Sequence, residues 1–188
     1  YRAFQTDTTD YSLQIGFKAP SGEDNESDEG ERLETEFQPS SGSWDFLVGG
    51  AVSHTVKRWG LHSNVLFHGT SEGSQQTELG DALFYNVAAV YSLSGRDAHH
   101  EHEVGTLHTH LKWDVMLEIN GEKRWKNKVA GAKQTNSGGD IVYLSPGIRL
   151  SYGKIGAFLS AGVPIVDNTN GLQTDVNFRL IGGIGMAF

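Results

Sequence analysis

The chain has 188 residues, among them 24 glycines and no cysteine, with a net charge of -8 and a mean hydropathy of -0.38. The lack of cysteine excludes disulfide scaffolds and thiolate metal sites, and the negative charge disfavours nucleic acid as a partner. No stretch approaches the ~18 apolar residues of a membrane helix. A low mean hydropathy remains compatible with an outer-membrane β-barrel, because half of each strand in such a barrel faces a polar interior.

Apolar and polar residues alternate along the chain in a pattern that is typical of strands with one apolar face. The pattern is clearest where Leu111, Trp113, Val115, Leu117 and Ile119 alternate with polar residues. The segments that show it are 11–19, 44–53, 61–68, 83–93, 111–120, 142–151, 155–165 and 175–188. Residues 1–9 are compatible with a ninth strand, but their pattern does not orient it.

The connections between these segments alternate in length. The tight turns lie at 57–60 and 152–154, and the long connections are 20–42, 69–80, 121–139 and 166–172. Bacterial barrels have long outer loops and short periplasmic turns, so the alternation predicts a periplasmic C-terminus. Residues 95–107 are the exception, because the pattern makes them a periplasmic turn although they are long and rich in histidine.

Together these patterns predict an all-β protein, a transmembrane antiparallel up-and-down β-barrel of eight or nine strands that forms one domain over residues 1–188. A soluble β-sandwich is the competing interpretation, but it has no reason to sort its loops by length. The final strand ends at the aromatic Phe188, which resembles the signal that the barrel assembly machinery recognises. Because the chain starts at Tyr1 without the features of a signal peptide, we expect upstream strands to be missing.

Residues 20–42 carry most of the excess negative charge. Between Ser21 and Glu36, eight acidic residues stand against the single Arg32. Such a run cannot enter a core, and it predicts a solvated extracellular loop. The alternative is a loop that gathers divalent cations near lipopolysaccharide.

The polar set of the alternating strands would face the lumen of a barrel. Its charged members include both signs, and the candidates for a constriction are Lys112, Asp114, Glu118, Arg149, Asp175 and Arg179. A balanced set fits either a path for polar solutes or internal ion pairs that fill the barrel, since small barrels are filled by their own side chains. Both interpretations stay open.

A histidine cluster lies in and just after the exceptional connection. Its candidate metal ligands are His99, His100, His102, His108 and His110. Imidazole and carboxylate groups suit Zn, Ni or Cu, while a solvated turn that responds to pH is the alternative. We expect no other cofactor. Motifs of hydrolases, phosphate-binding loops and zinc proteases are absent from the sequence, so we expect no enzymatic activity.

Several motifs follow one another along most of the chain: Ser43-Trp44-Asp45-Phe46-Leu47, Leu117-Glu118-Ile119-Asn120-Gly121, Asn136-Ser137-Gly138-Gly139, Leu144-Ser145-Pro146-Gly147-Ile148-Arg149 and Asn170-Gly171-Leu172-Gln173. In order and pattern they resemble the outer-membrane family assigned to transport in the phenol-degradation meta-pathway. The resemblance implies one barrel of about twelve strands that takes up hydrophobic or aromatic compounds.

We therefore expect a channel or transporter in the bacterial outer membrane for small hydrophobic, aromatic or weakly charged solutes. Its partners would be outer-membrane lipid, lipopolysaccharide, the assembly machinery and the solute. The alternative is a structural barrel with a filled lumen that anchors or sheathes a partner protein.

Overall fold

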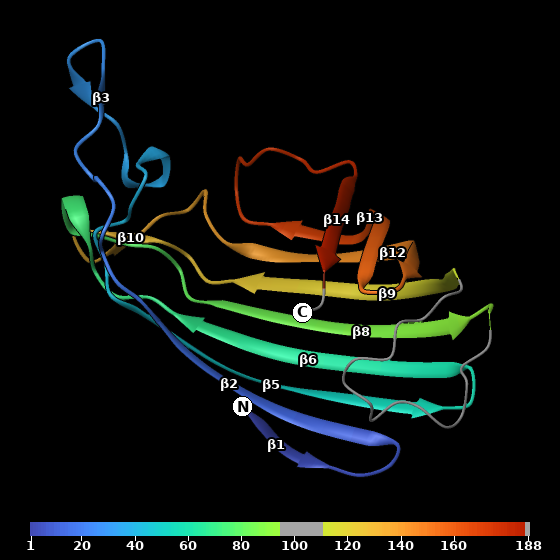
Figure 1. Cartoon of the computed structure of the whole chain (residues 1–188). Helices are drawn as coiled ribbons and strands as arrows, with labels where there is room; N and C mark the ends of the chain where they lie inside the picture. Colours follow the sequence, from blue (N-terminus) through green and yellow to red (C-terminus); the bar gives the residue numbers. More distant parts are fainter. Residues whose placement is uncertain (95–110, 187–188) are drawn as a thin grey trace.

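The chain forms one long antiparallel sheet in which strands pair in chain order (Figure 1). The computed structural model describes residues 1–94 and 111–186. The strands of the main sheet are β1 (Arg2–Gln5), β2 (Thr9–Lys18), β5 (Asp45–Val56), β6 (Trp59–Gly69), β8 (Ala82–Ser92), β9 (Lys112–Arg124), β12 (Gly139–Tyr152), β13 (Ile155–Thr169) and β14 (Arg179–Met186). The all-β, antiparallel part of the prediction is confirmed.

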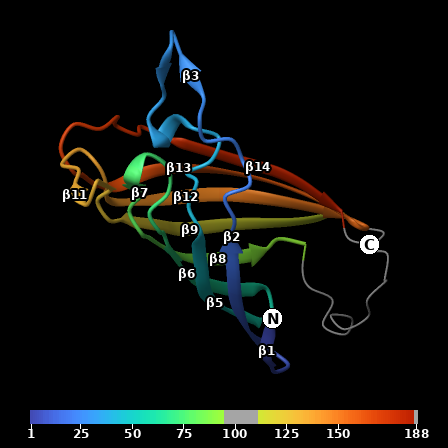
Figure 2. The same cartoon turned by 90° about the vertical axis from the view of Figure 1, so that its left-hand side faces the viewer.

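The main sheet is curved and open. Within the described ranges no pairing joins β1 to β14, so these two strands form its edges. β1 lies at the bottom of both views (Figures 1 and 2), and Figure 2 shows β14 above the other strands of the main sheet. The predicted closure into a barrel is therefore not observed in the described part of the chain. That part also contains no helix of the length and apolarity needed to span a membrane.

The predicted strands all occur, but their ends differ from the prediction. β9 continues to Arg124, where it still pairs with the start of β8 and the start of β12. β13 likewise extends to Thr169, well into the connection expected at 166–172. β14 is shorter than predicted, since it begins at Arg179 and residues 175–178 precede it. Phe188 lies outside the described residues.

The long connections gather at one end of the sheet, on the left of Figure 1. There β7 (Thr77–Glu78), β10 (Lys128–Val129) and β11 (Ala132–Lys133) form a small three-stranded sheet, which joins two of the connections. The acidic connection contributes a hairpin of β3 (Ser27–Asp28) and β4 (Glu31–Arg32) and the 3-10 helix η1 (Thr35–Phe37). A second 3-10 helix, η2, spans Ser74–Gln76. We call this end the loop end.

The opposite end of the sheet, the turn end, carries tight connections. Lys57 and Arg58 join β5 to β6, and Gly153 and Lys154 join β12 to β13. Lys57 has φ of 53° and Gly153 has φ of 58°. A positive φ at the first turn residue is what a two-residue hairpin needs to follow the twist of its strands.

The two faces of the main sheet have opposite polarity. We call outer face the one that carries Leu13, Val48, Val65, Val87, Leu117 and Leu159, and inner face the one that carries Asn64, Asn86, Asp114, Asn120, Arg149 and Ser160. On the outer face Leu117 is 49% exposed and Leu159 is 50% exposed. On the inner face Asp114 is only 8% exposed. Side chains on the inner side of a curved sheet converge and shield one another, which accounts for this difference.

Burial in this protein is thus the reverse of that in a soluble domain. Among the residues that the structure describes, three hydrophobic residues are buried, Ala82, Val90 and Tyr143, against eleven polar or charged ones. In soluble proteins, by contrast, the fully buried residues are mostly apolar.

Candidate functional site

One ion pair on the inner face joins β9 and β12. Arg149 lies opposite Asp114 in the strand register, and its Nε and Nη2 lie 3.0 and 2.7 Å from Asp114 Oδ2. The Asp114 side chain is 11% exposed and that of Arg149 is 44% exposed. Ser92, which is buried, lies opposite Asp114 on the other neighbouring strand. Two of the predicted constriction residues therefore form one ion pair.

A row of hydrogen-bonded side chains crosses four strands of the inner face. Asn86 Nδ2 donates to Asn64 Oδ1 at 2.9 Å, and Asn120 Nδ2 donates to Asn86 Oδ1 at 3.0 Å. Ser145 Oγ then donates to Asn120 Oδ1 at 2.7 Å. We call these four residues the amide row. Glu118 Oε2 also accepts from Asn120 Nδ2, at 3.2 Å, which attaches one predicted lumen residue to the row.

The remaining predicted residues lie at other levels. The guanidinium of Arg179 stands over the ring of Tyr143, 4.1 Å from its centre. Tyr143 and Arg149 are six residues apart on β12, which corresponds to roughly 20 Å along the strand. Lys112 pairs in register with Ser151 at the turn end, and Asp175 lies in the connection between β13 and β14. Five of the six residues thus occupy several heights of the inner face, Asp175 lies outside the sheet, and the six do not form a single cluster.

A second polar cluster marks the loop end of the inner face. Lys18 Nζ lies 2.6 Å from Asp45 Oδ2, and His68 Nε2 lies 3.2 Å from the same oxygen. Ser43 Oγ donates to the other carboxylate oxygen, Oδ1, at 2.7 Å, and Ser41 Oγ accepts from Lys18 at 2.6 Å. The Asp45 side chain is 1% exposed. This cluster fastens the end of the acidic connection to the sheet.

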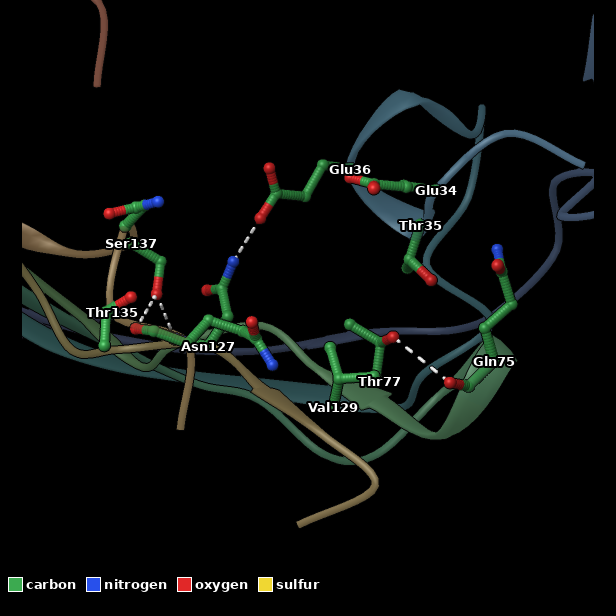
Figure 3. A pocket seen from close by; sticks show the side chains of 11 residues that line it. Glu34, Thr35, Glu36, Gln75, Thr77, Asn127, Val129, Thr135 and Ser137 are labelled. Atoms are coloured by element: carbon green, nitrogen blue, oxygen red, sulfur yellow. Dashed lines mark hydrogen bonds between the residues drawn. The ribbon is translucent and has the colours of Figure 1, made fainter. Parts of the chain in front are cut away.

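The long connections enclose a pocket at the loop end, with a volume of about 420 Å³. Figure 3 shows the side chains that surround it. Its walls come from the acidic connection, from η2 and β7, and from the segment around β10 and β11: Glu34, Thr35, Glu36, Gln75, Thr77, Asn127, Val129, Gln134, Thr135, Asn136 and Ser137.

Hydrogen bonds between the connections hold these walls together. Asn127 Nδ2 donates to Glu36 Oε1, and the backbone N–H of Asn127 donates to Ser137 Oγ at 2.9 Å. Thr35 Oγ1 donates to the carbonyl of Ser74 at 3.2 Å. The sequence predicted a solvated acidic loop, and β3 and β4 are indeed exposed. Thr35, in contrast, is 5% exposed, so the base of the loop packs against its neighbours.

The predicted metal ligands lie outside the described residues, since all five histidines fall within 95–110. In the ranges 1–94 and 111–186, no group of three or more His, Asp or Glu side chains is arranged to hold a metal ion.

The sequence placed the residues of the amide row on the polar face but did not single them out. Isolated asparagines carry no motif, and only the strand register brings them side by side. The pocket was missed as well, because its residues come from connections without periodicity.

Comparison with protein-family models, with curated proteins and with solved structures found no match to this chain.

Proposed function

We propose that the main sheet is part of the wall of a bacterial outer-membrane β-barrel that lets small, weakly charged or amphipathic solutes cross. The observation that carries this proposal is the reversed polarity of the sheet. An exposed apolar face of this extent would aggregate in water, whereas lipid-facing side chains of a barrel are apolar and interior ones polar. The long connections would then be extracellular and the C-terminus periplasmic.

Aromatic residues on the outer face support this orientation toward lipid. Trp113 near the turn end and Trp125 at the loop end are 39% and 43% exposed, and they are twelve residues apart. Twelve residues span roughly 40 Å along a strand, or roughly 30 Å across a membrane at a tilt of ~40°. That value equals the usual thickness of the hydrocarbon core, at whose borders tryptophan is enriched. Trp59 and Tyr91, with ring centres 4.8 Å apart, extend the belt at the turn end.

The strand count constrains how such a barrel closes. In a sheet of nine antiparallel strands the two edge strands run in the same direction, so β1 and β14 are parallel to each other. Unpaired edges are not tolerated in lipid, because each free backbone group costs several kcal/mol. We propose that an odd number of further strands closes the ring with antiparallel pairs throughout. A barrel of about twelve strands, as the family resemblance implies, satisfies this parity.

The inner face supports the passage of weakly charged solutes better than the passage of ions. Opposite charges cancel where Arg149 meets Asp114, and the amide row offers both hydrogen-bond donors and acceptors. Ion pairs on the described part of this face, such as Lys18 with Asp45 and Arg149 with Asp114, join opposite charges, whereas channels that select ions carry rings of like charge.

The density of these contacts also favours a second candidate, a structural barrel whose lumen is filled. In a polar network whose donors and acceptors already bond to one another, few hydrogen-bonding groups remain to bind a solute. Such a barrel would anchor or sheath a partner protein.

Reconstitution into lipid vesicles separates the two candidates. The purified protein is folded into vesicles loaded with a self-quenching dye, and heat-modifiable migration on a denaturing gel verifies insertion. A channel releases small solutes and retains large ones. Correct insertion without release of any solute would reject the channel and favour the filled barrel.

A further inference from the structure

The pocket at the loop end is lined mostly by polar and acidic residues, whose aliphatic parts also contribute to its walls. Ten of its eleven lining residues are polar or acidic, and Val129 is the single apolar one. Several of them are largely shielded from solvent, namely Thr35, Thr77, Asn127 and Ser137, which are 5 to 7% exposed. Oxygen acceptors therefore surround a space that lies between packed connections.

The charge of the lining is negative and not neutralised within it. Glu34 and Glu36 are its acidic members, and no lysine or arginine lines the pocket. Lys128 lies in sequence between two lining residues, but its Nζ contacts Glu78 Oε1 at 2.7 Å on the other side of β10. The hydrogen bond that Lys128 donates to the Glu78 carboxylate raises the pKa of Lys128. Arg32, the cation of the acidic run, donates to the carbonyl of Asp24 at 2.5 Å.

The volume of the pocket suits a small molecule better than a bare ion. A pocket of about 420 Å³ falls within the size range of sites for small molecules, roughly 300–1,000 Å³. A single metal ion would leave most of this space to water. The acceptor-rich lining instead matches a ligand that carries hydrogen-bond donors and positive charge.

We propose that this pocket binds a small organic cation with primary ammonium groups, held by the carboxylates of Glu34 and Glu36 and by the surrounding amide and hydroxyl oxygens. Glu36 is well placed for this role, because its Oε1 accepts from Asn127 and the carboxylate can accept further hydrogen bonds. The proposal goes beyond the proposed function and does not depend on it, because the pocket is built from the connections at the loop end and not from the inner face of the sheet.

Isothermal titration of the full chain in detergent micelles tests the site. The probe is 1,4-diaminobutane, and the matched neutral compound is 1,4-butanediol, which has the same number of non-hydrogen atoms. We expect the diamine to bind at least about tenfold more tightly than the diol, since hydrogen bonds between charged groups are stronger than those between neutral groups. Glu36→Gln should weaken binding of the diamine about tenfold, and it keeps an oxygen that can accept from Asn127.

A control variant separates the pocket from the general charge of the acidic run. Glu31→Gln removes the same charge from β4, which is exposed and does not line the pocket. We expect it to weaken binding by less than about twofold, because Glu31 does not line the pocket and would act on the diamine only at long range, where salt screens it. An equal loss in Glu31→Gln and Glu36→Gln would overturn the proposal.

Other results would also overturn it. Equal affinity for the diol would show a neutral polar pocket, and no heat with either compound would show a pocket filled by water. Displacement of the diamine by equimolar Ca²⁺ would indicate a metal site. Dye release from vesicles without binding of the diamine rejects the pocket alone, whereas binding without release rejects the channel alone.

Discussion

The outer and inner faces of the main sheet are built from the same strands but are stabilised in different ways. On the outer face, side chains such as Leu117 and Leu159 are about half exposed and make no hydrogen bonds. On the inner face, Asp114, Arg149 and the amide row are linked by hydrogen bonds between neighbouring strands. The comparison teaches that the fold depends on its solvent. Water disfavours the exposed apolar area of the outer face, whereas in the proposed barrel lipid would cover it.

The largest expected effect comes from placing a charge on the outer face. Leu117→Arg should cost roughly 2–4 kcal/mol if Leu117 lies near the middle of the bilayer. The fraction of protein that shows heat-modifiable migration after folding into vesicles measures this loss.

The control for this change lies on the same strand and the opposite face. Asp114→Asn keeps an oxygen that Arg149 can contact and should affect assembly far less. Comparable losses in the two variants would mean that the assignment of faces is wrong.

A second test compares two adjacent glycines that lie on opposite faces. A Cβ at Gly49, on the inner face, would lie 2.5 Å from the carbonyl oxygen of Val65, whereas a Cβ at Gly50 would have 3.6 Å to its nearest neighbour. Gly49→Ala should therefore destabilise the protein by about 1–3 kcal/mol, the usual cost of overpacking. Gly50→Ala should be close to neutral. Urea unfolding from vesicles gives both values, and equal midpoints would contradict the close packing of β5 on β6.

A smaller effect is expected from the amide row. Asn86→Ala removes the side chain that links Asn64 to Asn120 and should cost about 0.5–1.5 kcal/mol, because both partners are partly solvated. A double-mutant cycle with Asn120→Ala measures the coupling. Strict additivity of the two changes would show that the row contributes nothing as a network.

The smallest effect on stability, but a specific one on permeation, is expected from the arginines. Arg149→Ala leaves Asp114 without its ion-pair partner, so conductance in planar bilayers should shift toward cations. Unfolding should change by only about 1 kcal/mol, since the Arg149 side chain is 44% exposed.

Arg179→Ala alone should shift selectivity less, because Arg179 stands over a tyrosine ring and not beside a carboxylate. The double variant should behave like Arg149→Ala. If selectivity shifts only when both arginines are replaced, the two residues act together, as the sequence-based prediction of a single constriction requires.

The sequence predicted the strands well because a period of two is a local property that each segment carries by itself. Two registers also follow from local information: the two-residue turns place Ser53 opposite His62 and Ser151 opposite Gly156. The pairing of Asp114 with Arg149 could not be predicted from the sequence, because it depends on how β9 and β12 align across a connection of fourteen residues.

The loop end could not be predicted for a related reason. Asn127 and Ser137 are buried polar residues in segments without apolar periodicity, so their composition alone indicates solvated loops. Their burial arises from hydrogen bonds between connections that are distant in the chain, such as the one from Asn127 to Glu36.

The pairing of β7 with β10 has a mechanical consequence. It joins the connection before β8 to the connection after β9, through the pairs Thr77 with Val129 and Glu78 with Lys128. Neither connection can swing away without breaking these backbone pairs, so the two move as a single stiff frame. The acidic segment is tied to this frame through side chains, by the hydrogen bonds from Asn127 to Glu36 and from Thr35 to the carbonyl of Ser74, so a widening of the rim would begin by breaking these bonds.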